Sequence, residues 1–361
     1  MALLAYGGDT LTRKHAGAAL AIASLVAIGA FAYYRWRTSG FAWHEFARAL
    51  ETVDWSWLVL AIAVILFTYV GRAMRWEVMM RPLVEKTSIT RLFVATCIGF
   101  TAVVLFGRAG EPVRPYLIAK KEGVSFSTQV AAWVVERMLD LLMMLAIFGL
   151  ALSQVSHSTV RHGPKIGLIL ETGGYVAGVA GLASLALLLG LRQFKGNVQQ
   201  RLMDALAFLP EPAQVKVAGA LKSFGEGMES MRSGARTRLL ILYTVIEWTL
   251  IAGAFACVFK AFPATRGLGV TDVIIVLGFV SFGSVLQLPG VGGGVQIVTV
   301  LVLTELFGVT LEAATGVALV LWITTFVGIV PLGLALAFRE GLGWRSLRQI
   351  EQAAAAGEAG N

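Results

Sequence analysis

Six apolar segments of membrane-spanning length constrain this chain more than any other feature of its sequence. A hydrocarbon core about 30 Å thick requires roughly 20 apolar residues in a helix that crosses it. The segments are residues 16–34, 55–76, 130–152, 166–191, 239–262 and 313–338. Only 14% of the 361 residues are charged, whereas soluble domains carry about 25%. The sequence therefore predicts an all-α polytopic membrane protein with about six spanning helices.

Two further apolar stretches are interrupted by glycine and proline. Residues 92–107 run into the sequence Arg-Ala-Gly-Glu-Pro at 108–112, and residues 272–288 run into Pro-Gly-Val-Gly-Gly-Gly at 289–294. Each break is followed by too few residues for a second crossing. Irregular backbone at membrane depth is tolerated only where it is buried in protein or lines a wet cavity. We therefore expect two re-entrant hairpins, the alternative being two kinked transmembrane pairs.

The distribution of basic residues predicts the topology. With the N-terminus inside and both hairpins re-entrant, 20 of the 30 lysines and arginines fall inside, seven outside and three at membrane depth. This bias agrees with the positive-inside rule, so we expect both termini on the cytoplasmic side of the inner membrane. Residues 55–152 and 239–338 then have opposite topology and oppositely oriented hairpins. Such an inverted repeat, with an interrupted segment in each half, is typical of alternating-access transporters.

We expect three regions along the chain. Residues 1–54 hold an N-terminal anchor helix and an external interfacial segment, residues 55–338 form the transmembrane domain, and residues 339–361 form a cytoplasmic tail. Within the second region, residues 192–238 are basic, and their apolar residues recur at helical spacing. This pattern predicts a cytoplasmic connector of amphipathic helices in the membrane interface.

Charged residues at the first break recur every third position. Arg108, Glu111 and Arg114 face broadly one way if Pro112 lies in the first turn of a helix, where proline is tolerated. Gly110 permits a tight turn and the close approach of another backbone. Two guanidiniums around one carboxylate leave a net positive charge that suits a phosphate oxygen. The alternative is a structural ion-pair cluster that closes the hairpin.

Further ionisable residues lie inside apolar helices. Glu136, Arg137 and Asp140 are spaced so that the two carboxylates share a helix face and Arg137 reaches Asp140. Intramembrane charges mark a pathway or a buried partner, and these carboxylates can neutralise the arginines of the first hairpin. Glu247 is either another such partner or a proton-coupling carboxylate.

Arg72 and Arg75 end the expected helix 55–76 on the cytoplasmic side. Long basic side chains at such positions snorkel to the headgroups. We therefore expect no specific role for either arginine.

At the second break, the groups available to a ligand are backbone N–H groups rather than charged side chains. Pro289, Gly290, Gly292, Gly293 and Gln296 surround a helix start whose exposed N–H groups suit an anion or a headgroup. The Lys-Ser/Thr pair of a P-loop is missing, so nucleotide binding is not indicated. The sequence contains no nucleophile–base pair and no metal-ligand spacing. We therefore expect no enzymatic activity, no metal and no cofactor.

These motifs resemble those of a known family. Residues 108–114 and 135–140 resemble the Arg-x-Gly-Glu-x-x-Arg and Glu-Arg-x-x-Asp signatures of the flippase-like family, which includes the transmembrane region of lysylphosphatidylglycerol synthase. Residues 289–293 are similar to its Pro-Gly-Gly-x-Gly motif, and residues 71–76 to its Arg-x-x-Arg-Trp. Two positions depart from the pattern: Gln296 stands where the family commonly has glutamate, and residues 319–322 lack its arginine.

The resemblance implies a domain that moves aminoacylated phosphatidylglycerol or a polyprenyl-linked glycolipid between leaflets. We expect a lipid transporter in which Arg108 and Arg114 hold the headgroup phosphate, and Glu111, Glu136 and Asp140 position them. Its partners would be membrane lipids with anionic headgroups, and no basic aromatic face indicates nucleic acid. The alternative is a non-catalytic scaffold for a separately encoded lipid-modifying enzyme.

Overall fold

The computed structural model describes residues 40–157, 179, 181–183, 186, 204–205, 210–227, 233–284, 287–288 and 292–342. Within this part of the chain there are eleven α-helices, two 3-10 helices and one pair of two-residue strands. The all-α class is thus confirmed apart from that strand pair. Residues 16–34 lie outside the described part, as do most of residues 166–191. The four helical segments that are apolar and long enough to cross a membrane are Trp55–Met80, Ile89–Gly110, Gly234–Ala261 and Leu311–Arg339.

The first half of the described chain begins with a short helix and a long one. Asp54 caps the long helix by accepting a hydrogen bond from the backbone N–H of Ser56, at 3.1 Å. Beyond it the chain makes a helical hairpin and then a third long helix. The elements are α2 (Trp43–Glu51), α3 (Trp55–Met80), α4 (Ile89–Phe106), η1 (Gly107–Gly110), α5 (Val113–Glu122) and α6 (Phe126–His157).

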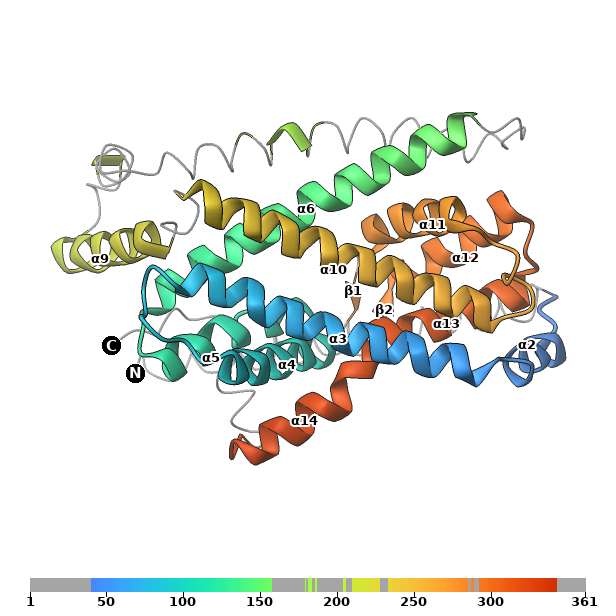
Figure 1. Ribbon diagram of the computed structural model, residues 1–361, viewed down its shortest axis with the longest axis horizontal. Coiled ribbons are helices and arrows are strands. Elements are labelled where there is room, and N and C mark those ends of the chain that lie inside the picture. Colours follow the sequence, from blue (N-terminus) through green and yellow to red (C-terminus); the bar gives the residue numbers. More distant parts are fainter. Residues whose placement is uncertain are drawn as a thin grey trace, which may run out of the picture.

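The second half repeats this order after a connecting helix. A long helix, α10, lies along α3 and is followed by a second hairpin and a last helical segment (Figure 1). The elements are α9 (Glu211–Gly227), α10 (Gly234–Ala261), α11 (Val270–Gly283), β1 (Gln287–Leu288), β2 (Gly292–Gly293), α12 (Gly294–Phe307), α13 (Leu311–Thr325), η3 (Val327–Ile329) and α14 (Val330–Arg339).

In the first hairpin, α5 returns along α4. A Cβ at Gly110 would lie 2.3 Å from the carbonyl oxygen of Ala102, so only glycine allows this close approach. At the open end, Arg91 Nε lies 3.3 Å from the carboxylate of Glu122. The two helices of the hairpin are therefore close to each other both at the tip and at the open end. The helical part of the first arm is longer than expected, because Ile89–Gly110 has 22 residues and could cross a membrane by length alone.

The second hairpin pairs α11 with α12 through the antiparallel strands β1 and β2, with Gln287 opposite Gly293. Gly293 has φ +119°, a conformation that favours glycine. The side chain of Gln296 accepts a hydrogen bond from Gly293 N at 2.7 Å and so caps α12. Pro289 and Gly290 lie outside the described residues.

The two hairpins enter from opposite ends of the molecule, with α4 and α5 at one end and α11 and α12 at the other (Figure 1). Their tips meet in the middle, where β1 contacts η1. The presence of two oppositely oriented helical hairpins at the glycine- and proline-containing breaks agrees with the sequence-based expectation.

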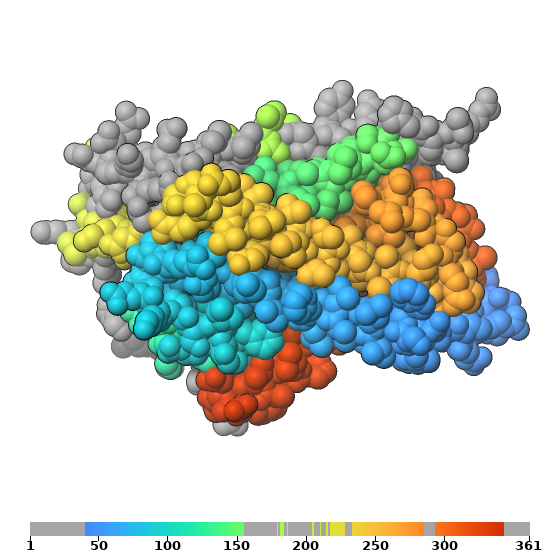
Figure 2. Space-filling view, in the orientation of Figure 1, coloured from blue at the N-terminus to red at the C-terminus, as the bar shows by residue number. Residues whose placement is uncertain are grey.

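The last apolar segment, Leu311–Arg339, is long enough to cross a membrane, as expected for residues 313–338, but it consists of α13, η3 and α14 rather than one uninterrupted helix. Pro331 explains the division. Proline supplies no N–H to the preceding turn and disfavours helical backbone in the residue before it, and it sits in the first turn of α14. Figure 2 shows α14 projecting from one side of the body, where it packs on α4.

The expected cytoplasmic connector is described mainly through α9. This helix packs on the start of α6, where the hydroxyl of Thr128 donates to the carbonyl oxygen of Ser223 at 3.0 Å. The interfacial segment expected before residue 55 contains α2, which packs on α13. In the connector, α9 is a helix where the apolar spacing predicts one.

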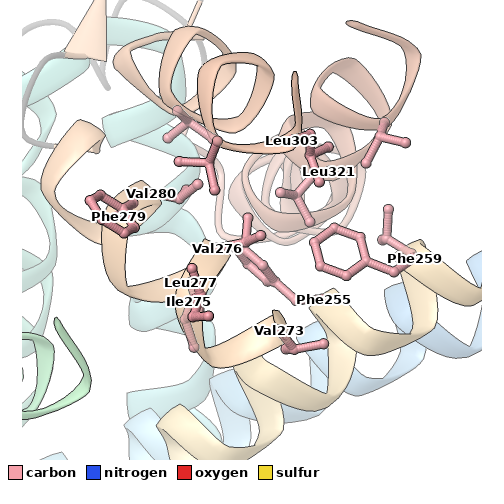
Figure 3. Packing of buried hydrophobic residues seen from close by; sticks show 14 of the residues in the cluster. Phe255, Phe259, Val273, Ile275, Val276, Leu277, Phe279, Val280, Leu303 and Leu321 are labelled. Carbon is pink, nitrogen blue, oxygen red and sulfur yellow. The ribbon is translucent and has the colours of Figure 1, made fainter. Parts of the chain in front are cut away.

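The apolar core of the second half lies where its hairpin meets α10 and α13. Rings of Phe255 and Phe259 on α10 face Val276 on α11 and Leu321 on α13 (Figure 3). A second core, around the buried Trp76, joins α3 to the first hairpin and to α6. The charged residues described next lie between these cores, at the level of the hairpin tips.

Candidate functional site

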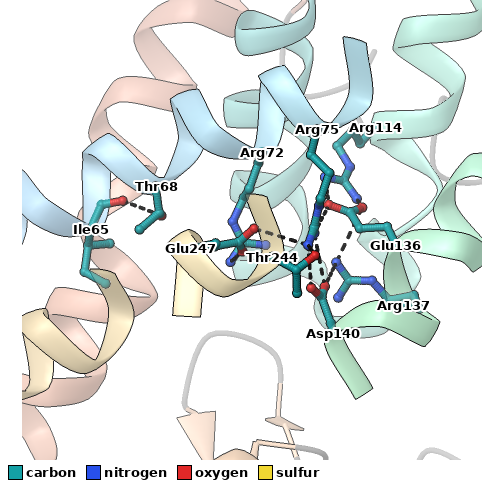
Figure 4. Close-up of polar contacts among 10 residues, drawn as sticks. All are labelled: Ile65, Thr68, Arg72, Arg75, Arg114, Glu136, Arg137, Asp140, Thr244 and Glu247. Atoms are coloured by element: carbon teal, nitrogen blue, oxygen red, sulfur yellow. Dashed lines mark hydrogen bonds and ion pairs between the residues drawn. The ribbon is translucent and has the colours of Figure 1, made fainter. Parts of the chain in front are cut away.

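Arg75 is the centre of a buried ionic network (Figure 4). Its guanidinium is fully buried and lies 2.5 Å from Glu136, 2.7 Å from Asp140 and 3.4 Å from Glu247. It also donates to the hydroxyl of Thr244 at 3.1 Å. The network joins α3 to α6 and α10. The expectation that Arg75 snorkels to the headgroups is wrong, because α3 continues to Met80 and keeps this side chain inside the bundle.

Arg114 is held by the same carboxylate on the other side. Both of its terminal nitrogens donate to Glu136, and its side chain is only 5% exposed. The guanidinium also stacks over the ring of Trp76, 4.0 Å from the centroid, where a cation–π interaction stabilises the charge. Arg114 thus anchors α5 to α3 and α6. Glu136 does neutralise an arginine of the first hairpin, as its position predicts.

Arg137 is the more accessible arginine of α6. It forms an ion pair with Asp140 at 3.1 Å, the spacing that the sequence predicts, and lies 3.6 Å from Glu136. Its side chain is 35% exposed, and its buried Nε has no hydrogen-bond partner among the described residues. The exposed part of this guanidinium borders the cavity and can donate to a ligand oxygen there.

Glu247 pairs with α3 rather than with the first hairpin. Its carboxylate lies 2.6 Å from Arg72 and is itself almost completely buried. Arg72 is also held against the ring of Phe100, with the guanidinium 4.4 Å from the centroid. The expected snorkelling of Arg72 is therefore also wrong.

A cavity of about 520 Å³ lies beside this network. Its charged lining residues are Arg72, Arg108, Glu111, Arg114, Arg137, Asp140 and Glu247. The rest of the lining is mostly apolar and comes from α3, α4, α6, α10, α11, the start of α12 and the end of α13, with a few hydroxyl-bearing side chains among it. The cavity therefore combines a charged region with apolar walls, which suits an amphipathic ligand.

The charges of the cavity do not cancel. Four arginines face three carboxylates, and the fully buried pair of Arg75 and Glu136 behind them adds one charge of each sign. Among the described residues, one positive charge is left over. An anion is the ligand that would balance it, and arginine suits phosphate because its planar fork can donate two hydrogen bonds.

The expected site residues fall into two groups. The first hairpin, α6 and α10 bring together Arg108, Glu111, Arg114, Arg137, Asp140 and Glu247 around the cavity, with Glu136 behind them. Gly110 shapes the tip of that hairpin. In the second hairpin, Gly292 and Gly293 form β2 and Gln296 caps α12, and none of these three lines the cavity.

Sequence reasoning missed Arg72 and Arg75 as members of the site. One signal could have identified them. Glu136, Asp140 and Glu247 lie at membrane depth and need cationic partners, and the two arginines are the basic residues of the adjacent helix that face them.

Comparison with known proteins agrees with this architecture. No curated protein sequence and no solved structure matches the chain significantly. The family model described as the lysylphosphatidylglycerol synthase TM region matches residues 18–333. The chain therefore belongs to the lysylphosphatidylglycerol synthase TM region family and is a multi-pass membrane protein.

Proposed function

We propose that this protein is a non-enzymatic lipid transporter that moves an anionic phospholipid or a polyprenyl-linked glycolipid between the leaflets of the inner membrane. The charged cavity between the hairpin tips is the observation that carries the proposal. Arginines inside apolar helices are costly and are retained where they serve a substrate path or a buried partner. This cavity holds more positive than negative side chains, which leaves a charge for a lipid phosphate.

The packing of the helices supports an inverted repeat. The central pair, α3 and α10, contains the first long helix of each half. On either side, the hairpin of one half packs on the last helical segment of the other, since α4 contacts α14 and α11 contacts α6. In this arrangement the hairpins are re-entrant, and rocking of one half against the other would open the cavity to each leaflet in turn.

Within the cavity, Arg108 and Arg137 are the residues that would hold the phosphate. Arg108 is exposed and Arg137 is partly exposed, and both line the cavity. Arg114 is already bound by Glu136 on both terminal nitrogens. Its role is to position the first hairpin.

The scaffold alternative makes a different use of the same residues. A scaffold needs the ion pairs to hold the helices together, and it needs no accessible arginine beside them. Arg137 pairs with Asp140 and Glu136 as a scaffold would need, but its side chain is also 35% exposed and borders the cavity, where a scaffold needs no accessible cation. We therefore favour transport over a scaffold role.

Replacing Arg137 with glutamine is expected to slow lipid movement at least about 10-fold, the effect of losing one charge-assisted hydrogen bond. The measurement is the exchange between leaflets of a fluorescent phosphatidylglycerol in vesicles that contain the purified protein. The matched control is Arg266→Gln, because Arg266 is 54% exposed and lies away from the cavity.

The control variant should retain the wild-type rate. Movement by Arg137→Gln at that same rate would remove the proposed phosphate contact. Failure of the wild-type protein to move any anionic lipid would favour the scaffold.

A further inference from the structure

The two helices of the last apolar segment belong to different parts of the molecule. Helix α13 packs on α12 and α2, and its Leu321 lies in the apolar core of the second half. Helix α14 packs on α4 instead, and its Ala337 lies in the core around Trp76. Figure 1 shows the two helices meeting at an angle near the middle of the molecule. The segment therefore passes from one core to the other at η3.

Helix α14 is held tightly against α4. A Cβ at Gly333 would lie 2.7 Å from the backbone carbonyl oxygen of Cys97 and closer still to the hydroxyl of Thr101, so only glycine fits there. The same hydroxyl donates to the carbonyl oxygen of Ile329 at 3.5 Å, which joins the end of η3 to α4. Small residues that bring helix backbones together give close packing in membranes. The contact therefore leaves little room for α14 to move along α4.

An ion pair joins the far end of α14 to the same hairpin. Lys121 Nζ, in the last turn of α5, lies 2.7 Å from the carboxylate of Glu340, the residue that follows α14. The two side chains are 18% and 36% exposed. Arg91 pairs with Glu122 and so holds α4 to α5 at this end. Helices α4, α5 and α14 are thus joined to one another, although α14 comes from the second half of the chain.

Residues 326–328 connect α13 to this group through irregular backbone. Phe326 has φ −114°, far from the value of about −63° in a regular helix. Gly328 lies within η3, and a Cβ there would meet no described atom closer than the carbonyl oxygen of Ile323, at 3.7 Å. Packing therefore does not require this glycine, in contrast to Gly333. A 3-10 turn inside a helical segment often marks a hinge, and glycine lets the backbone torsions change at low cost.

This connection borders the cavity. Thr325 and Phe326 both line it, and so do Arg108 and Glu111 at the tip of the first hairpin. A change of torsion at residues 326–328 would therefore move the charged hairpin tip relative to the wall that the end of α13 forms. The shape of the cavity would change with it.

We propose that α14 moves with the first hairpin as one body, and that residues 326–328 are the hinge about which this body moves against α13 and the second hairpin. The ion pair between Lys121 and Glu340 links the hairpin to α14 at the end far from the hinge. The role of the hinge in lipid movement rests on the proposed function, whereas the hinge itself does not.

Spin labels test the hinge without an assay of transport. The labels are attached at exposed positions outside the cavity lining, in a protein whose buried native cysteines are removed by Cys97→Ala and Cys257→Ala. Lys120→Cys with Arg339→Cys gives a pair within the proposed body, and Ile323→Cys with Arg339→Cys gives a pair across the hinge. Distances are measured by electron paramagnetic resonance in lipid nanodiscs that contain phosphatidylglycerol. We expect one narrow distribution for the first pair and a broad or two-peaked distribution for the second.

A narrow distribution across the hinge would show that α13 and α14 are rigidly joined and would overturn the proposal. A broad distribution between the labels at Lys120 and Arg339 would overturn it as well, because α14 would then move separately from the first hairpin. The two expected distributions in a protein that exchanges no lipid in vesicles would contradict the proposed function but support the hinge.

Exchanging the charges of the ion pair tests its part in lipid movement. Lys121→Glu and Glu340→Lys are each expected to slow the exchange of fluorescent phosphatidylglycerol between leaflets by about 2 to 5 times, the effect of losing a partly exposed ion pair. The double variant restores a pair of opposite charges and should recover the wild-type rate. The matched control is Arg81→Gln, which breaks an exposed pair with Glu77 at the end of α3.

Lys121→Glu should also broaden the distribution between the labels at Lys120 and Arg339, whereas the control should change neither the rate nor the distribution. Single variants that move lipid at the wild-type rate would contradict the role of the ion pair as the link between α14 and the first hairpin. A double variant as slow as either single one would contradict it too.

Discussion

Replacing Arg75 with methionine is expected to lower the free energy of unfolding by about 3 to 5 kcal/mol, because it leaves buried carboxylates without their cation. The guanidinium of Arg75 is shared by Glu136, Asp140 and Glu247, which lie on two different helices. Glu136 would retain Arg114 and Glu247 would retain Arg72, so the network should weaken rather than disappear.

Arg75→Lys refines this expectation. Lysine retains the charge but cannot donate in several fixed directions from one planar group. Its stability should therefore lie between those of the wild type and Arg75→Met.

The measurement is chemical unfolding of the purified protein in mixed micelles. The matched control is Arg81→Gln, on the same helix end, where the arginine is 52% exposed and pairs with Glu77. An exposed pair contributes at most about 1 kcal/mol. Equal stability of the Arg75→Met and Arg81→Gln proteins would show that the buried network does not hold the helices together.

Replacing Gly110 with alanine is expected to destabilise the protein by about 1 to 3 kcal/mol, the usual cost of overpacking. The added Cβ would lie 2.3 Å from the carbonyl oxygen of Ala102 and 2.6 Å from the nitrogen of Val103. These are backbone atoms of α4, so rotation of a side chain cannot relieve the contact. The tip of the first hairpin has to shift, and it carries Arg108 and Glu111 with it.

Gly253→Ala is the control for this substitution. Gly253 lies within α10, and a Cβ there would have no neighbour within 4 Å. Alanine favours the helix over glycine by up to about 1 kcal/mol, so this variant should be as stable as the wild type or more stable. The same unfolding measurement applies to both. An unchanged stability of Gly110→Ala would mean that the hairpin is less tightly closed than the structure indicates.

Much of the fold could be predicted from the sequence because membrane helices are determined by local composition. The apolar runs gave α3, α6 and α10 to within a few residues of their main bodies, and the glycine-rich breaks gave both hairpins. Each of these signals depends on a short stretch of chain, since backbone groups in lipid have to be satisfied within the segment.

The exact ends of helices were harder to predict, and one site error followed from this. The apolar run predicts a helix that ends at Trp76, which makes Arg75 a snorkelling residue near the helix end. The helix continues to Met80 and places Arg75 inside the bundle. Which partner it meets there depends on how α3 packs against α6 and α10. That packing involves residues far apart in the sequence, and no single segment records it.

Some of the charge pairs could also be predicted from the sequence, and others could not. Arg137 with Asp140 follows from helical spacing alone, and the ion pair is present. The sequence predicts that Glu247 pairs with an arginine of the first hairpin or couples protons, whereas its partners are Arg72 and Arg75 of α3. That choice depends on the packing of α10 along α3. Pro331 alone does not predict the break in the last apolar segment, since proline also occurs in continuous transmembrane helices when neighbouring groups satisfy the backbone.

The most direct test of the central claim is an experimental structure of the protein in lipid nanodiscs that contain phosphatidylglycerol. The claim is that the cavity between the hairpin tips receives a lipid headgroup. It predicts phosphate density inside the cavity, within hydrogen-bond distance of Arg137 or Arg108, with the acyl chains passing toward the apolar walls. Lipid density confined to the outer surface of the helices, with only water beside Arg137, would contradict it.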